Sequence, residues 1–176
     1  MIYLVNIFLT IFICVQGNLM YDNISVVASN NNMNLLLVIY IMISSIIFTY
    51  KTLIIYRIIP NKHIKYFIYL TGIIMFVGSL FPYRFNGIDL FSKIHVNCSM
   101  IGCVSFLVLL FIYTRLLCIY HYNIYLKVHW IYDFCIQVLI ICFLFFSRVN
   151  GYLEILYSLI VCFYLHKLEI EIKKTT

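Results

Sequence analysis

A short polar series interrupts the apolar middle of the chain, where Asp89, Ser92, His95 and Ser99 follow one another at intervals of three or four residues. In a helix this spacing places side chains on one face. A histidine near a carboxylate can hold a metal ion, so the series could serve a metal-dependent lipid hydrolase within the membrane. Together with Arg84 of the preceding loop, these residues form a candidate polar site, which we expect at the outer end of the protein.

The hydrolase hypothesis, centred on His95 and Asp89, lacks part of its ligand set. One histidine and one aspartate supply only two of the three protein ligands that a catalytic zinc typically needs. The remaining histidines are expected on the opposite side of the membrane: His63, His121, His129 and His166. The sequence therefore favours a protein without catalytic chemistry of its own, and it predicts no metal site and no cofactor.

Small residues accompany the polar series on two neighbouring apolar segments. They are Gly72, Gly78, Ser79 and Pro82 before the series and Gly102 after it. Small side chains let helices approach closely in lipid, where packing drives helix association. We interpret them as the packing seam between the third and fourth membrane-spanning helices. This seam either is closed or opens outward into a polar pocket that contains His95.

Arg115 and Asp133 are a further pair with a predicted contact. Asp133 lies in an apolar segment, and an unpaired aspartate at the centre of a membrane helix costs about 2.5–3.5 kcal/mol on insertion scales. Arg115 lies near the inner end of the preceding segment. We predict that the two residues form a structural ion pair; lipid headgroup binding and proton movement are the alternatives.

The elements that position all these residues are apolar helices. Only 10% of the 176 residues are charged, 65% are apolar, and the mean hydropathy is +1.04. A soluble domain typically has about 25% charged residues, so most of this surface must face lipid. A helix needs about 20 mostly apolar residues to cross the hydrocarbon core. The predicted fold is an all-α integral membrane protein, a single domain (1–176) with six transmembrane helices at residues 2–19, 35–56, 66–83, 94–118, 131–146 and 152–165.

Lysine and arginine determine the expected orientation, because cytoplasmic loops carry an excess of both. With both termini cytoplasmic, the inner side carries Lys51, Arg57, Lys62, Lys65, Arg115, Lys127, Lys167, Lys173 and Lys174. The outer side then carries only Arg84, Lys93 and Arg148. The net charge of +6 does not indicate nucleic-acid binding, because the positive residues lie in short clusters between apolar runs.

The stretches "GSLFPY" and "DLFSKIHVNCSMIG" resemble the six-span DRAM/Sfk-type membrane proteins and the related six-helix bacterial family of unknown function. The matching positions are Gly78, Phe81, Pro82, Asp89, Ser92, His95 and Ser99. In those families a Gly–Phe–Pro element closes the third helix, and a histidine followed by small residues opens the fourth. The resemblance implies a six-span plan. Its eukaryotic members are linked to autophagy, lipid asymmetry or glycolipid-anchor remodelling.

From these observations we expect a small multi-pass membrane protein that binds lipids or a protein partner through the outer-facing seam of the third and fourth helices. Membrane lipids, a membrane-protein partner and a second copy of the chain are the expected partners. The alternatives are the metal-dependent lipid hydrolase and a small transporter. The expected location is a bacterial plasma membrane, or an endomembrane if the chain is eukaryotic.

Overall fold

The computed structural model describes residues 2–59, 61–81, 83–84 and 89–174, and this part of the chain contains seven helices and no strand. The helices are α1 (Ile2–Cys14), α2 (Ile24–Asn30), α3 (Asn34–Tyr56), α4 (Lys62–Leu80), α5 (Leu90–Tyr120), α6 (Tyr122–Phe146) and α7 (Gly151–Lys173). The predicted all-α class is therefore confirmed for these residues.

Short polar side chains begin four of the helices. Asn23, Asn61, Asp89 and Asn150 each accept a hydrogen bond from a backbone N–H in the first turn of the following helix. Such caps satisfy amide groups that have no partner within the helix. The apolar runs thus supply the helices, and isolated Asn and Asp residues determine where these begin.

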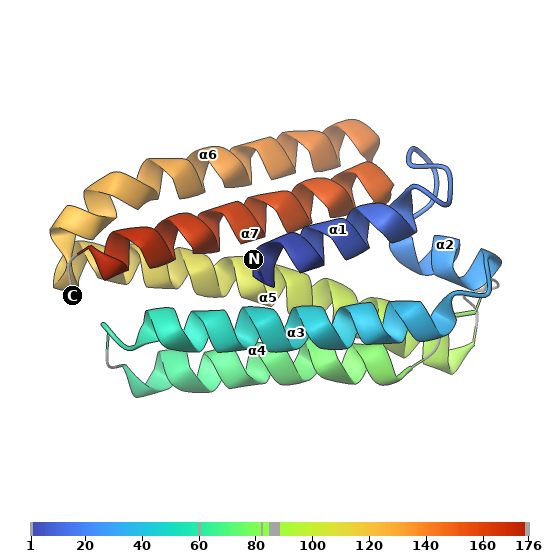
Figure 1. Cartoon of the computed structure of the whole chain (residues 1–176), viewed down its shortest axis with the longest axis horizontal. Helices are drawn as coiled ribbons and strands as arrows, with labels where there is room; N and C mark the ends of the chain where they lie inside the picture. The colour runs from blue at the N-terminus through green and yellow to red at the C-terminus, as the bar shows by residue number, and fades with distance from the viewer. Residues whose placement is uncertain (1, 60, 82, 85–88, 175–176) are drawn as a thin grey trace.

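The long helices lie side by side and alternate in direction from α3 to α7 (Figure 1). Each packs against its neighbour in the series α3, α4, α5, α6 and α7, and α1 contacts both α7 and α3. The helices therefore form a closed ring. The interior of this ring is available for a core and for a cavity.

Four helices, α3, α4, α5 and α6, are long and apolar enough to cross a membrane. They correspond to the predicted segments 35–56, 66–83, 94–118 and 131–146. Two helices extend well beyond the predicted spans 131–146 and 152–165. Helix α6 begins earlier, at Tyr122, and α7 continues to Lys173. Sequence hydropathy misses these extensions, since their polar residues continue a helix without continuing the apolar run.

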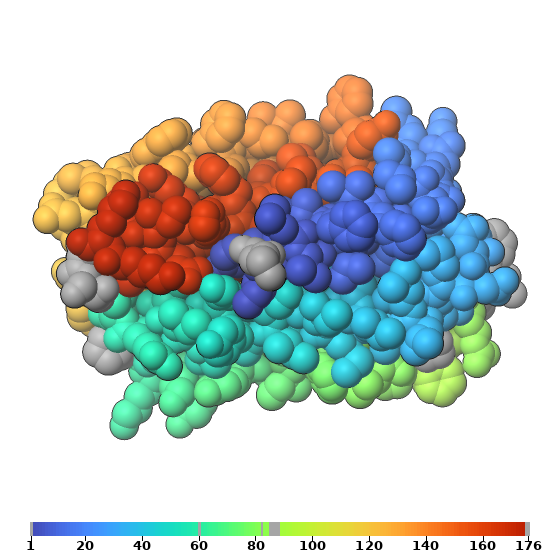
Figure 2. Space-filling view, in the orientation of Figure 1, coloured from blue at the N-terminus to red at the C-terminus, as the bar shows by residue number. Residues whose placement is uncertain are grey.

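Helix α1 is shorter than the predicted segment 2–19, because it ends at Cys14. Its 13 residues span about 20 Å, less than the roughly 30 Å of a hydrocarbon core. In the space-filling view α1 lies between α7 and α3 on the face shown (Figure 2). The first apolar segment is therefore a short helix packed onto longer ones.

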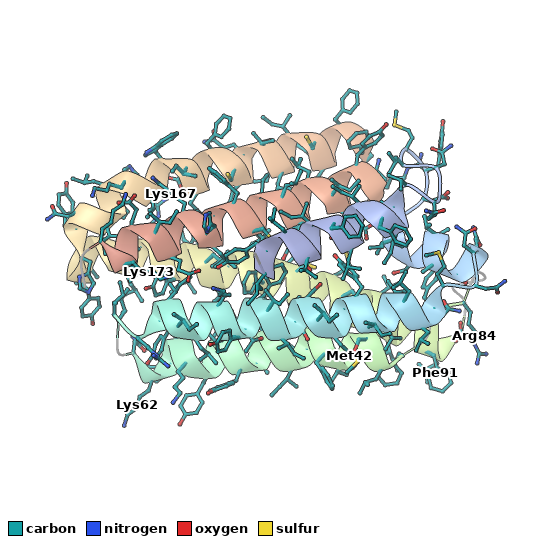
Figure 3. All side chains as sticks on the ribbon, in the orientation of Figure 1. Met42, Lys62, Arg84, Phe91, Lys167 and Lys173 are labelled. Carbon is teal, nitrogen blue, oxygen red and sulfur yellow. The ribbon has the colours of Figure 1, made fainter. Side chains whose placement is uncertain are left out.

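The nine lysines and arginines predicted on the inner side lie toward one end of the bundle. They occur near the ends of α3, α5 and α7 and near the beginnings of α4 and α6. Lys62, Lys167 and Lys173 are labelled toward this end in Figure 3, and Arg84 and Phe91 toward the other. The directions of the helices are consistent with this placement, because α4 begins and α5 ends at the end that carries these lysines. We refer to the two ends as the lysine-rich end and the α2 end.

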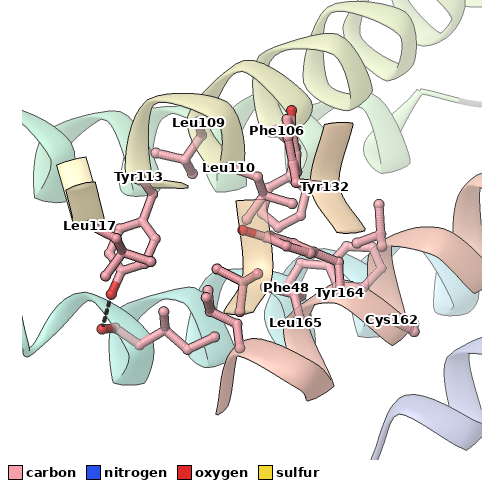
Figure 4. Close-up of a cluster of buried hydrophobic side chains, with 14 of the residues drawn as sticks. Phe48, Phe106, Leu109, Leu110, Tyr113, Leu117, Tyr132, Cys162, Tyr164 and Leu165 are labelled. Atoms are coloured by element: carbon pink, nitrogen blue, oxygen red, sulfur yellow. Dashed lines mark hydrogen bonds between the residues drawn. The ribbon is translucent and has the colours of Figure 1, made fainter. Parts of the chain in front are cut away.

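Aromatic and aliphatic side chains fill the interior of the ring on the side toward the lysine-rich end (Figure 4). Phe48 of α3 stacks on Phe106 of α5, with ring centroids 5.3 Å apart. The hydroxyl of Tyr113 donates a hydrogen bond of 2.7 Å to the carbonyl of Ile55, so this buried tyrosine is also satisfied. This part of the interior is a packed core.

The predicted seam between the third and fourth spans is the contact of α4 with α5, and the small residues serve it only in part. A Cβ atom at Gly78 would lie 3.1 Å from Cys98 Cβ, and one at Gly102 would lie 2.6 Å from Met75 Cγ, so both glycines bring α4 and α5 together. Gly72 instead faces Thr49 of α3.

This placement corrects the prediction for Gly72. Six residues separate Gly72 from Gly78, which leaves them about 120° apart around α4, and α4 is packed between two helices. Ser79 is buried and donates a hydrogen bond to the carbonyl of Phe76 in its own helix. Pro82 lies outside the described residues.

Candidate functional site

A cavity of about 430 Å³ occupies the interior of the ring on the side of the α2 end. Residues of α3, α5, α6 and α7 form most of its wall, with two residues from α2 and single contributions from α4 and from Val149. Most of the lining is apolar, and the polar members are Ser25, Tyr40, Ser44, Ser99, Glu154 and Tyr157. Volumes of roughly 300–1,000 Å³ are typical of ligand pockets.

The cavity opens sideways between α5 and α6. Several lining residues of these two helices are exposed: Met100, Val104, Ile140, Phe143 and Leu144, the last with 69% of its surface accessible. Nearer the lysine-rich end the same helices are in contact, since the hydroxyl of Tyr132 donates a hydrogen bond to the carbonyl of Leu107. The opening is therefore in the half of the bundle near α2, and it faces the surface that lipid would cover.

Helix α2 covers the cavity at the α2 end of the bundle. The sequence predicts a loop at this position, but Ile24, Val27 and Ala28 are spaced as one helix face and are all buried. The amide of Ile24 donates a 2.6 Å hydrogen bond to Glu154 of α7. The hydroxyl of the next residue, Ser25, lies 3.0 Å from Nε2 of His95 on α5. Consecutive residues thus connect α2 to two different walls of the cavity.

The segment before α2 is attached to the beginning of α7. The amide of Gly151 donates to the carbonyl of Asp22, and the side-chain amide of Asn150 donates to the carbonyl of Met20. A Cβ at Gly151 would lie 2.9 Å from a side-chain carbon of Leu19, so glycine permits this close approach. These contacts hold α2 over the cavity.

His95 is buried, with 2% of its surface accessible, and within the described ranges its polar contacts are with α2 and with the end of α4. Its Nδ1 atom lies 2.9 Å from the carbonyl oxygens of both Gly78 and Phe81. A carbonyl oxygen only accepts, so Nδ1 carries a proton. In the neutral ring Nε2 is then an acceptor, and the hydroxyl of Ser25 donates to it.

The structure divides the predicted polar site into two sets. Ser92 donates a 2.6 Å hydrogen bond to Asp89 and accepts one from the backbone amide of Arg84. The hydroxyl of Ser92 thereby lowers the pKa of the Asp89 carboxyl. Asp89 thus caps α5, and Ser92 connects this cap to the backbone of Arg84. The described contacts of His95 involve none of them, which corrects the prediction of one cluster.

Ser99 belongs with His95. It lies one turn after His95 on α5, and it lines the cavity. Its Oγ atom is buried and has no hydrogen-bond partner among the described residues. Its Oγ atom lies toward α4, 3.4 Å from where a Cβ of Gly78 would be, so Ser99 contributes to the cavity wall without presenting its hydroxyl to the cavity.

Sequence reasoning missed the role of Ser25 and the depth of Glu154. Glu154 lies near the start of the predicted span 152–165, and its carboxylate lines the cavity and accepts a hydrogen bond from the amide of Ile24. The spacing of Ile24, Val27 and Ala28 after Asn23 would have indicated α2. No local signal indicates that Ser25 meets His95, because 70 residues separate them.

The other predicted pair, Arg115 and Asp133, forms an ion pair in which Nη2 of Arg115 lies 2.7 Å from Oδ1 of Asp133. Tyr125 accepts a second hydrogen bond from the same guanidinium group. Both charged side chains are more than one-third exposed. The pair joins α5 and α6 near their connection, away from the cavity.

No group of three or more His, Cys, Asp and Glu side chains arranged to hold a metal ion occurs within the described ranges. His121 contacts the carbonyl of Ile58, and His129 the carbonyl of Tyr125 in its own helix. His166 packs against the ring of Tyr3. These histidines have structural contacts at a distance from His95.

Comparison with known proteins adds no relative to this description. No protein-family model, curated protein or solved structure matches the chain.

Proposed function

We propose that this chain is an integral membrane protein that binds a lipid acyl chain in the cavity between α3, α5, α6 and α7. The observation that carries the proposal is the apolar cavity of about 430 Å³ with its opening between α5 and α6. In a membrane this opening faces acyl chains, and an apolar cavity of this size favours an apolar occupant over water.

The distribution of polar groups supports an amphipathic ligand. Ser25, Ser99 and Glu154 come from the α2 end, whereas Phe48 and Leu107 come from deeper along their helices. From Ser99 to Leu107 the wall of α5 extends for about 12 Å. A lipid placed here would have its ester region near the polar residues and its chain along the apolar wall.

The proposed site differs in detail from the expected seam. Gly78 and Gly102 bring α4 and α5 into contact, so the seam itself has little room. The cavity lies inside the ring, where α5 contributes Ser99 and Cys103 to its lining. The lipid-binding role is retained, and its location moves from the seam to the interior of the ring.

The proposal includes the membrane arrangement. The lysine-rich end, where α7 ends, would face the cytoplasm, because positive residues favour that side. Five long helices would cross the membrane, with α1 as a short sixth member. A bacterial plasma membrane and kinship with the DRAM/Sfk-type proteins would agree with this arrangement.

Photo-crosslinking with a phospholipid that carries a diazirine on its acyl chain tests the proposal in lipid nanodiscs. We expect crosslinks at cavity residues of α5 and α6. Replacing Leu139, which lines the cavity, with Trp should reduce them about tenfold, because the larger ring would occupy space that the acyl chain needs.

Ile141→Trp is the matched control, because Ile141 is 64% exposed on the same helix and does not line the cavity. It should leave cavity crosslinking unchanged. Equal crosslinking of cavity residues in the wild type and Leu139→Trp would contradict the proposal. So would crosslinks confined to the outer surface.

A further inference from the structure

We propose that Ser25 is an acyl-accepting nucleophile with His95 as its general base, and that the protein cleaves or transfers an acyl ester of the lipid in the cavity. The inference rests on the proposed lipid-binding function. It is carried by the contact between Ser25 and His95, by the tautomer that the surroundings of His95 impose, and by the position of Ser25 in the cavity wall.

The geometry is that of a nucleophile, a base and an orienting group. Oγ of Ser25 lies 3.0 Å from Nε2 of His95, within the distance needed for proton transfer. The carbonyls of Gly78 and Phe81 occupy the other side of the ring and require a proton on Nδ1. Nε2 is therefore the basic nitrogen, and it points to the serine hydroxyl.

The environment suits this chemistry. His95 is buried beside the ring of Tyr83, whereas Ser25 is half-buried and lines the cavity. The nucleophile therefore faces the position of a bound ester while its base is shielded. Glu154 holds Ile24 at a hydrogen-bond distance of 2.6 Å, which makes it a positioning residue for the neighbouring serine.

Rotation about χ1 would turn the Ser99 hydroxyl from the α4 side toward the cavity, where it would donate a hydrogen bond to the oxyanion formed during acyl transfer. A hydroxyl aimed at the oxyanion stabilises a tetrahedral intermediate most effectively when it does not have to leave another partner. Oγ of Ser99 is buried and has no partner in the described part of the chain, and the residue belongs to the same cavity wall as Ser25. It lies on the face of α5 that also carries His95.

The reaction balances without a metal ion or a redox partner. Oγ of Ser25 forms a bond to the ester carbonyl carbon while its proton passes to Nε2 of His95. The tetrahedral intermediate then breaks the bond to the alcohol oxygen, which takes that proton and leaves as the free alcohol. Water next attacks the acyl-serine and gives a proton to Nε2. The acyl–Oγ bond breaks, Oγ recovers the proton, and the fatty acid leaves; a lipid hydroxyl in place of water gives a new ester.

An alkyl fluorophosphonate tests the inference, because this probe phosphonylates activated serines and its chain fits an apolar cavity. With the full chain in nanodiscs, mass spectrometry should find the adduct on the peptide that contains Ser25. Ser25→Ala should remove the adduct. His95→Gln should slow its formation by about 100-fold or more, as expected for loss of a general base.

Ser29→Ala is the matched control, since Ser29 lies one turn further along α2 and does not line the cavity. It should be labelled like the wild type. The same samples, in vesicles of phosphatidylglycerol and phosphatidylethanolamine, should release fatty acid or form a new ester only when Ser25 is present.

The outcomes separate the two proposals. Acyl-chain crosslinks in the cavity without a Ser25 adduct would retain lipid binding and overturn acyl transfer. Absence of both would overturn both. An adduct that forms equally fast in His95→Gln would overturn the role of His95. The wild-type adduct decides the question even if a variant fails to fold.

Discussion

Buried polar side chains connect α1 to the rest of the bundle. Asn6 donates a 3.0 Å hydrogen bond to Ser158 of α7 and accepts one from Ser44 of α3. Thr10, one turn later, contacts both Ser158 and the hydroxyl of Tyr40. Because α1 is short and many of its large apolar residues are exposed, these hydrogen bonds account for much of its attachment.

Replacing Asn6 with Leu should therefore destabilise the protein. The hydroxyls of Ser44 and Ser158 each lose one hydrogen bond but keep another, Ser44 with the carbonyl of Tyr40 and Ser158 with Thr10. The net contribution of a hydrogen bond to stability is about 0.5–1.5 kcal/mol. The measurement is the thermal unfolding of purified protein in a mild detergent. Phe8→Leu is the control, because Phe8 lies on the exposed face of the same helix and should change little. Equal melting temperatures for the two variants would contradict this account.

At the scale of whole helices, glycines determine how closely α4 approaches its neighbours. The atoms facing the two glycines of the α4–α5 contact differ in kind. Gly102 faces the flexible side chain of Met75, whereas Gly78 faces a Cβ atom and the backbone amide of Ser99. Flexible side chains can move aside, but a backbone cannot move without shifting its helix.

We expect Gly102→Ala to be tolerated and Gly78→Val to be destabilising by about 1–3 kcal/mol, the usual cost of overpacking. The loss should appear as a lower melting temperature. Gly78→Val should also weaken fluorophosphonate labelling, because the carbonyl of Gly78 orients His95. Gly78→Val protein as stable as Gly102→Ala would mean that α4 and α5 have more room than the structure shows.

Over the whole molecule, charge is concentrated at the lysine-rich end, where α7 extends beyond the expected span 152–165. Glu169 lies 2.9 Å from Lys51 of α3 and 3.0 Å from Lys173. Burial raises the pKa of the Glu169 carboxyl, but the hydrogen bonds and charges of these lysines outweigh it and lower the pKa to about 2. Hydrogen bonds from Lys174 and Lys167 lower the pKa of Glu171 to about 2 as well.

Acid should therefore destabilise this end of the bundle. A carboxyl with a lowered pKa in the folded state contributes stability that is complete above its ordinary value of 4.5 and is lost as the pH falls toward about 2. Melting temperatures should accordingly decrease as the pH falls through this interval. The double variant Glu169→Gln and Glu171→Gln should start lower at neutral pH and decrease less. An identical decrease in both proteins would assign the acid sensitivity to other groups.

The sequence predicts contacts that have few geometric alternatives. Arg115 and Asp133 lie on consecutive helices on either side of a short connection, so antiparallel packing brings them together. Helices α3 to α6 follow from long apolar runs. The contact of Ser25 with His95 has no such basis, because it depends on where α1 ends and on how the segment 15–23 is attached to α7.

The sequence also provides too little information about short elements. Helix α2 has seven residues, too few for a periodic pattern to stand out in a polar segment. The sequence could not predict which neighbouring helix Gly72 faces either. It depends on α4 lying between α3 and α5, and hydropathy contains no information about which helices are neighbours.

The attachment of α1 to α7 has a consequence during synthesis. The contact from Asn6 to Ser158 spans 152 residues of chain, and at about 5–20 residues per second its second half emerges about 8 to 30 s after the first. Throughout that interval Asn6 lacks this partner, so its hydrogen bond to Ser158 cannot form until α7 has been synthesised.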